Sequence, residues 1–128
     1  MKLDLKKLKL RKVNEKLQNF DRRQNDRDFT IINPEGNHAV CAGLTEEINI
    51  NIKGHVGYYC AGMNQKASVT IDGNVGTGVA ENMMSGKVHV KGNASQSAGA
   101  TAHGGLLIID GDASSRCGIS MKGVDIVV

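Results

Sequence analysis

Residues 69–87 read VTIDGNVGTGVAENMMSGK, residues 88–106 read VHVKGNASQSAGATAHGGL, and residues 107–111 begin the same pattern again with LIIDG. Both complete segments are 19 residues long, and each carries a glycine at its fifth position. The spacing of 19 also separates four glycines along the chain, namely Gly54, Gly73, Gly92 and Gly111. Self-similarity at one fixed, short period is the sequence signature of a repeat architecture.

Rows of 19 residues place similar side chains in the same column. A turn-forming polar residue follows each glycine, as expected where the backbone bends through positive φ. These residues are His55, Asn74, Asn93 and Asp112. When each row is counted from its repeated glycine, two apolar positions at its end alternate with one outward position, as in a β-strand. The apolar pairs are Val69 and Ile71, Val88 and Val90, Leu107 and Ile109, Ile126 and Val128, with Ile50 and Ile52 one row earlier.

The constant period predicts how the rows are arranged in space. A 19-residue unit cannot bury its own apolar side, but similar rows stacked on one another can. Each strand then pairs in parallel with its copy about 4.8 Å away. We therefore predict an all-β fold, a parallel β-helix with 19-residue coils over residues 29–128. The aromatic content of 3% fits a narrow interior filled by small and β-branched side chains.

Residues 1–28 differ from the rest of the chain in composition. They hold ten Lys and Arg against five Asp and Glu, a net charge of +5, whereas the remaining residues carry −2. Four apolar residues follow the spacing of one helix face. They are Leu10, Val13, Leu17 and Phe20. We expect a basic leader with a short amphipathic helix over about residues 8–19, followed by a polar loop.

Composition also bounds the partners and the compartment. The basic helix face is interpreted as a solvated face, because no aromatic residues are interleaved to stack on bases; we expect no nucleic-acid partner. No run of about 18 apolar residues occurs, so no membrane-spanning helix is expected. Three cysteines in a chain that begins without an apolar signal region favour reduced thiols, and we place the protein in the cytoplasm.

The C-terminal row stops one residue short, at Val128, on an apolar edge. Solenoids need polar terminal caps. We therefore expect either that the chain is a fragment of a longer one, or that another subunit or a second copy stacks on this edge.

The cysteines are the first candidates for chemistry. Counting in steps of 19 from Cys60 places Cys41 and Cys117 in the same column. Because Val79 and Ala98 share that column, buried inert thiols are favoured over a metal cluster or a catalytic thiol. No CxxC or HxxxH spacing indicates a zinc site. We predict no catalytic, cofactor-binding or metal-binding residue in this chain.

The large side chains in the loop half of each row are candidates for a partner interface. They are Tyr58, Tyr59, Met63, Met83 and Met84. Tyr and Met are favoured in the cores of protein interfaces, although these residues could instead cover the edge of the coil interior. We add His103, which could face a partner's active site. We also add Ile108 and Val127, where the outward strand position turns apolar.

Four segments carry a resemblance to a known family. They are GHVGYYCAGMN (54–64), VAENMMSGKV (79–88), VKGNASQSAGATAHGGLL (90–107) and GDASSRCGISMKGVDIVV (111–128). They resemble the GXGXG-repeat domain at the C-terminus of the glutamate synthase large subunit. The resemblance is closest to the stand-alone form of that domain, the small subunit of N-methylglutamate synthase and related complexes. It covers about residues 8–128.

The resemblance implies a right-handed β-helix without catalytic residues. Such a domain joins a glutamine-amidotransferase-like subunit to an FMN-bearing, iron–sulfur glutamate-synthase-like subunit, so both cofactors are expected on the partner. Family members continue for several more coils. Two alternatives stay open: an independent β-helix enzyme that uses Cys60 or His103, and the equivalent scaffold subunit of formylmethanofuran dehydrogenase.

Overall fold

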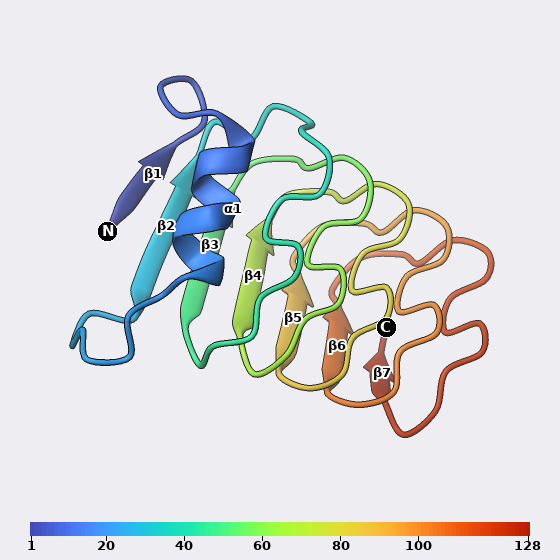
Figure 1. Ribbon diagram of the computed structural model, residues 1–128. Coiled ribbons are helices and arrows are strands. Elements are labelled where there is room, and N and C mark those ends of the chain that lie inside the picture. Colours follow the sequence, from blue (N-terminus) through green and yellow to red (C-terminus); the bar gives the residue numbers. More distant parts are fainter.

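The computed structural model describes residues 1–128 as seven parallel strands and one helix (Figure 1). The strands lie side by side in chain order in a single sheet. The elements are β1 (Lys2–Asp4), α1 (Leu10–Gln18), β2 (Asp28–Ile32), β3 (Asn49–Lys53), β4 (Ser68–Asp72), β5 (Lys87–Val90), β6 (Leu106–Ile109) and β7 (Asp125–Val127). After each strand from β2 to β6 the chain makes one looped coil and returns beside its starting point (Figure 1). The predicted parallel β-helix is confirmed.

The period of 19 is the register of the sheet. From β3 to β7 each strand residue lies beside the residue 19 positions later, as in the pairing of Asn49 with Ser68 and of Ser68 with Lys87. The alternating apolar positions point inward and are almost completely buried. They are Ile50, Ile52, Val69, Ile71, Val88, Val90, Leu107 and Ile109. Burial of one such side chain stabilises the fold by about 1.5–3 kcal/mol.

The looped side of each coil has an alternating backbone. In the coil after β4 every second residue is left-handed, with φ of 81° at Gly78, 55° at Ala80 and 58° at Asn82. The Gly78 N–H donates to the Gln96 carbonyl in the next coil at 2.9 Å. The Ala80 N–H donates to the Cys60 carbonyl in the preceding coil, also at 2.9 Å. The alternation therefore ties each coil to both of its neighbours.

The repeated glycines have a different cause from the one predicted. Of the four glycines that define the period only Gly54 has a positive φ, of 132°, so the expectation of positive φ was wrong for the other three. A Cβ on Gly73 would lie 2.5 Å from the Gly54 carbonyl oxygen, and one on Gly92 would lie 2.6 Å from the Gly73 oxygen. Glycine is required there because consecutive coils approach too closely for any side chain.

Helix α1 closes the N-terminal end of the solenoid (Figure 1). Val13 and Leu17 are fully buried, which confirms the predicted apolar stripe. The Asn14 side chain donates to the Ala39 carbonyl and accepts from the Cys41 N–H, each at 2.9 Å. Gln18 similarly donates to a backbone carbonyl of the first coil, at 2.8 Å. The helix thus supplies hydrogen bonds that a preceding coil would otherwise make.

Strand β1 is an element that the sequence analysis missed. It pairs with β2 through Lys2 and Thr30, so the basic leader contributes the first strand of the sheet. Leu3 is its inward residue and is 2% exposed. Three residues with a single inward position leave no period to detect in the sequence.

One polar side chain is fully buried among the apolar ones. The Asn64 amide nitrogen donates to the Ala67 carbonyl at 2.8 Å and to the Ser85 carbonyl of the next coil at 3.3 Å. Its side-chain oxygen has no partner. Asn64 therefore fixes the turn before β4 to the coil that follows it.

The last coil differs from those above it in exposure. Ile119, Met121 and Val127 are each about half exposed, whereas the inward apolar residues of the earlier coils are almost completely buried. Separately, no helix has the length and apolar character needed to cross a membrane.

Candidate interaction surface

An open hollow of about 380 Å³ lies on the looped side of the solenoid. Its lining residues come from three successive coils: Met63, Gln65, Asn82, Met84 and His103. The side chains of Met63 and Met84 are 47% and 49% exposed. Three of the residues predicted at an interface are therefore brought together by the stacking of the coils.

Hydrogen bonds between coils fix the backbone of this hollow. The Met84 N–H donates to the Asn64 carbonyl of the coil before, and the His103 N–H donates to the Met83 carbonyl, each at 2.8 Å. The Thr101 hydroxyl also donates to the Asn82 side-chain oxygen of the preceding coil. The hollow thus combines a fixed backbone with flexible, polarisable thioethers, which adapt to the shape of an apolar ligand or side chain.

Met83 does not belong to this surface. Its side chain is fully buried in the core, whereas its neighbour Met84 points out. The prediction that Met83 faces a partner is therefore wrong, whereas that for Met84 stays a prediction. A pair of adjacent identical residues gives no sequence signal for which one points inward.

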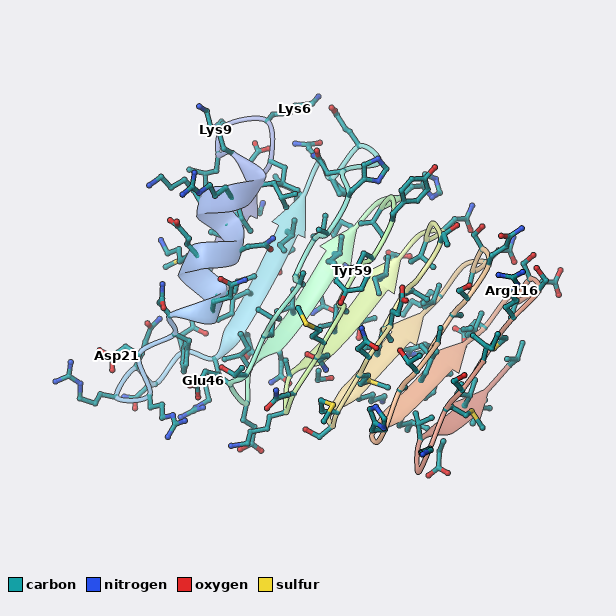
Figure 2. All side chains as sticks on the ribbon, turned by 45° about the vertical axis from the view of Figure 1, so that its right-hand side comes forward. Lys6, Lys9, Asp21, Glu46, Tyr59 and Arg116 are labelled. Atoms are coloured by element: carbon teal, nitrogen blue, oxygen red, sulfur yellow. The ribbon has the colours of Figure 1, made fainter.

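The two tyrosines occupy different environments. Tyr58 is 60% exposed, and its ring stacks on the His38 imidazole with centroids 4.4 Å apart and planes 18° from parallel. Tyr59 is half-buried, and its ring lies against Gly62, on the looped side of the coils (Figure 2). Of the two, Tyr58 offers the larger free surface.

Ile108 and Val127 lie on a second face, the outer face of the sheet. The two residues are register partners on β6 and β7, with Ile108 half-buried and Val127 55% exposed. Met63 and Met84 line the hollow on the looped side instead. The predicted interface residues thus divide between two sides of the solenoid.

The cysteines are not in one column, and that prediction was wrong. The Ala80 N–H donates to the Cys60 carbonyl, and the Ala61 N–H makes the equivalent bond to Val40. Val40 is therefore the counterpart of Cys60, and Cys41 lies one position further on. The cause is the first coil, in which β2 and β3 pair at a separation of 21 instead of 19.

Burial determines the state of the thiols. Cys41 and Cys60 are fully buried, and loss of solvation raises the pKa of Cys60 to about 12 and that of Cys41 well above its ordinary value. Cys117 is half-buried, and burial raises its pKa as well. A thiol that stays protonated is a poor nucleophile and metal ligand. No group of three or more His, Cys, Asp or Glu side chains is placed to hold a metal ion.

Three histidines make contacts that sequence reasoning missed. His89 on the outer sheet face lies 2.9 Å from the Asp110 carboxylate, a pairing across coils of residues 21 apart. His38 and His55 each use Nδ1 to accept a backbone N–H from the following coil. Such contacts could be sought in the sequence by reading residues about 19–21 apart as neighbours.

The leader leaves cationic side chains at the N-terminal end. Lys6 is paired with Glu35 of the first coil at 3.3 Å, whereas Lys9 extends away from the solenoid (Figure 2). Arg22, in contrast, binds Glu46 of the first coil at 2.8 Å, and this hydrogen bond lowers the pKa of the Glu46 carboxyl. Part of the basic charge thus fastens the leader to the coils.

Comparison with known proteins gives one significant similarity to report. The chain is 55% identical over 57 residues to Protein GlxC of Rhizobium meliloti (strain 1021). The aligned region is 44% of this chain and 25% of GlxC, so the match spans about a quarter of that relative's length. No protein-family model matches the chain. No solved structure matches it.

Proposed function

We propose that this chain is a noncatalytic assembly subunit of a glutamine-dependent, glutamate-synthase-like complex of the N-methylglutamate synthase type. In that role it joins an amidotransferase-like subunit to an FMN-bearing, iron–sulfur synthase subunit. The observation that carries the proposal is the register-matched stack of 19-residue coils, whose segments resemble the GXGXG-repeat domain. The similarity to GlxC over 57 residues supports a relationship to a longer protein.

The build of the solenoid suits a scaffold. Successive coils are hydrogen-bonded to one another along the sheet and along the looped side, so surface residues on different coils keep fixed spacings. Met63, Met84 and Tyr58 are exposed there. Residues of these types are enriched in the buried cores of protein interfaces.

The cysteines of this chain do not fit an iron–sulfur cluster. Such clusters are normally held by four Cys thiolates. The chain has three cysteines, of which Cys41 and Cys60 are buried as protonated thiols. We therefore assign the cluster to the synthase partner, and the FMN with it.

The burial of Cys60 also weighs against the alternative of an independent β-helix enzyme. A catalytic thiol needs an accessible site and a lowered pKa, and Cys60 has neither. His103 stays accessible, so turnover by the purified chain that is lost in His103→Ala would favour the enzyme. The identity of the partner subunits distinguishes the proposed role from the related scaffold role in formylmethanofuran dehydrogenase.

The test is native mass spectrometry of the untagged protein isolated from its source cell. We expect it to co-purify with an amidotransferase-like subunit and an FMN-carrying subunit. Met84→Asp places a charge in the methionine-lined hollow and should release at least one of them. Ser115→Asp adds the same charge at an exposed loop position of the last coil and serves as the control. Isolation of the wild-type chain without such partners would contradict the proposal.

A further inference from the structure

The corners after β3, β4 and β5 are each linked to the next coil by a side-chain acceptor. His55 Nδ1 accepts the Asn74 N–H at 2.9 Å. One coil on, the Asn74 side-chain oxygen accepts the Asn93 N–H at 2.8 Å, and the Asn93 oxygen then accepts the Asp112 N–H at 2.9 Å. Three corners therefore share one contact, but the first of them uses an imidazole in place of an amide.

A second imidazole acceptor lies close by, in the first coil. His38 Nδ1 accepts the Tyr58 N–H at 2.8 Å, and its ring stacks on the Tyr58 ring. The Tyr58 and Asn74 N–H groups donate to no backbone carbonyl. The two histidines are thus their acceptors within the chain.

The chemistry of the two acceptor types differs in one respect. An imidazole nitrogen accepts a hydrogen bond only while it carries no proton, and in the imidazolium both nitrogens are donors. An asparagine oxygen keeps its lone pairs throughout the physiological pH range, whereas histidine changes charge within it. Protonation of His38 or His55 would therefore bring an imidazolium N–H against a backbone N–H. The contacts made by the asparagine side-chain oxygens would not change.

The charges around these histidines cancel in pairs. His55 shares a hollow with Glu35 and Lys53. Glu35 is paired with Lys6 at 3.3 Å and Lys53 with Asp72 at 3.8 Å. The ring of His38 lies on the uncharged ring of Tyr58. Neither His38 nor His55 forms an ion pair with a carboxylate, whereas His89 lies 2.9 Å from the Asp110 carboxylate.

We propose that His38 and His55 form a proton-operated latch on the corners of the first coils. While neutral, they hold the corner that carries Tyr58, a residue 60% exposed. When protonated, they release the Tyr58 and Asn74 N–H groups and loosen that corner, while the corners held by Asn74 and Asn93 stay closed. The inference rests on these contacts and is independent of the proposed function.

The test is amide hydrogen exchange of the full chain by NMR, expressed as protection factors at about pH 7.5 and pH 5. We expect the protection of the Tyr58 and Asn74 amides to fall about tenfold or more at the lower pH, since each loses its acceptor. The Asn93 and Asp112 amides should change less than about twofold. A uniform loss at all four amides would indicate general acid unfolding and would overturn the latch.

A matched variant is supplied by the chain itself. His55→Asn copies the residue that holds the next two corners, so it should remove the pH dependence at Asn74 and leave that at Tyr58. His38→Asn should have the reciprocal effect. Unchanged pH dependence at Asn74 in His55→Asn would refute the assignment. If a variant fails to fold, the wild type still tests the proposal. The pH dependence of the Tyr58 and Asn74 amides is then compared with that of the Asn93 and Asp112 amides.

Discussion

The stacking of the coils requires that Gly92 and the equivalent glycines, Gly73 and Gly111, carry no Cβ atom. A Cβ on Gly92 would lie 2.6 Å from the Gly73 carbonyl oxygen, well inside van der Waals contact. The Asn74 side-chain oxygen would lie closer still, but the Gly73 carbonyl is backbone and cannot move aside as a flexible side chain would. The defining residue of the repeat is thus selected by the distance between coils.

We predict that Gly92→Ala destabilises the fold by about 3 kcal/mol, at the upper end of the usual cost of overpacking. The comparison is Gly36→Ala, because Gly36 has a φ of 74° but no atom within 4 Å of an added Cβ. That variant carries only the strain of a left-handed alanine, about 1 kcal/mol. Urea unfolding of both variants measures the difference. An equal loss in the two variants would contradict the explanation that the close approach of consecutive coils requires glycine at position 92.

At the scale of the element, α1 acts through polar as well as apolar side chains. Val13 and Leu17 close the apolar interior, while Asn14 satisfies one carbonyl and one N–H of the first coil. A helix cannot continue a parallel sheet, yet its amide side chains reach the backbone groups that a preceding coil would pair.

We predict that Asn14→Leu destabilises the protein although it adds apolar surface. It leaves the buried Cys41 N–H without its acceptor, at about 1–3 kcal/mol. The Ala39 carbonyl loses its contact with Asn14 and keeps only the Ala42 N–H, at 3.3 Å. Glu15→Ala is the control on the same helix, since its contacts to Arg11 and Lys12 are surface ion pairs 3.7 Å long. Such pairs contribute about 0–1 kcal/mol. Chemical denaturation distinguishes the two, and equal stability of Asn14→Leu and wild type would contradict this account of the cap.

At the scale of the whole molecule, the sealed interior makes stability depend on alkaline pH. The pKa of Cys60 is about 12 in the folded protein against an ordinary value of 9.0, and that of Cys41 is raised in the same direction. Below pH 9 both states hold the thiol protons, and the full stability is present. Above that value the unfolded chain releases them while the folded chain does not, so stability falls until the pH reaches the folded pKa.

The expected slope is about 1.4 kcal/mol per pH unit for each buried thiol. Cys60→Ala should make the decline shallower by that amount. The substitution is matched to the site, because Ala98 occupies the equivalent position two coils later. Urea unfolding at a series of pH values between about 8 and 11 gives the slopes. Identical slopes for wild type and Cys60→Ala would show that this thiol ionises in the folded state.

The sequence predicted the parts of the molecule that obey the period. Strands β3 to β6 and their inward residues follow directly from the spacing of 19. The spacing also places β7, but Val128, predicted to pair with Ile126 as an apolar strand position, is 64% exposed. The first coil departs from that spacing, so counting by 19 misplaced Cys41. Of the predicted surface, Met63, Met84 and His103 do meet in one hollow, whereas Met83 is buried. Contacts such as that of Asn14 with the first coil depend on side-chain direction, which periodicity does not determine.

The stacking has a consequence for the dimensions of the protein. Each strand of the sheet touches only the strand before it and the strand after it, so no contact joins the helix-covered end to the far end. Nothing inside the molecule limits the number of repeats, and each one adds the same increment of about 4.8 Å. The distance between two surface residues along the solenoid is therefore proportional to the number of coils that separate them.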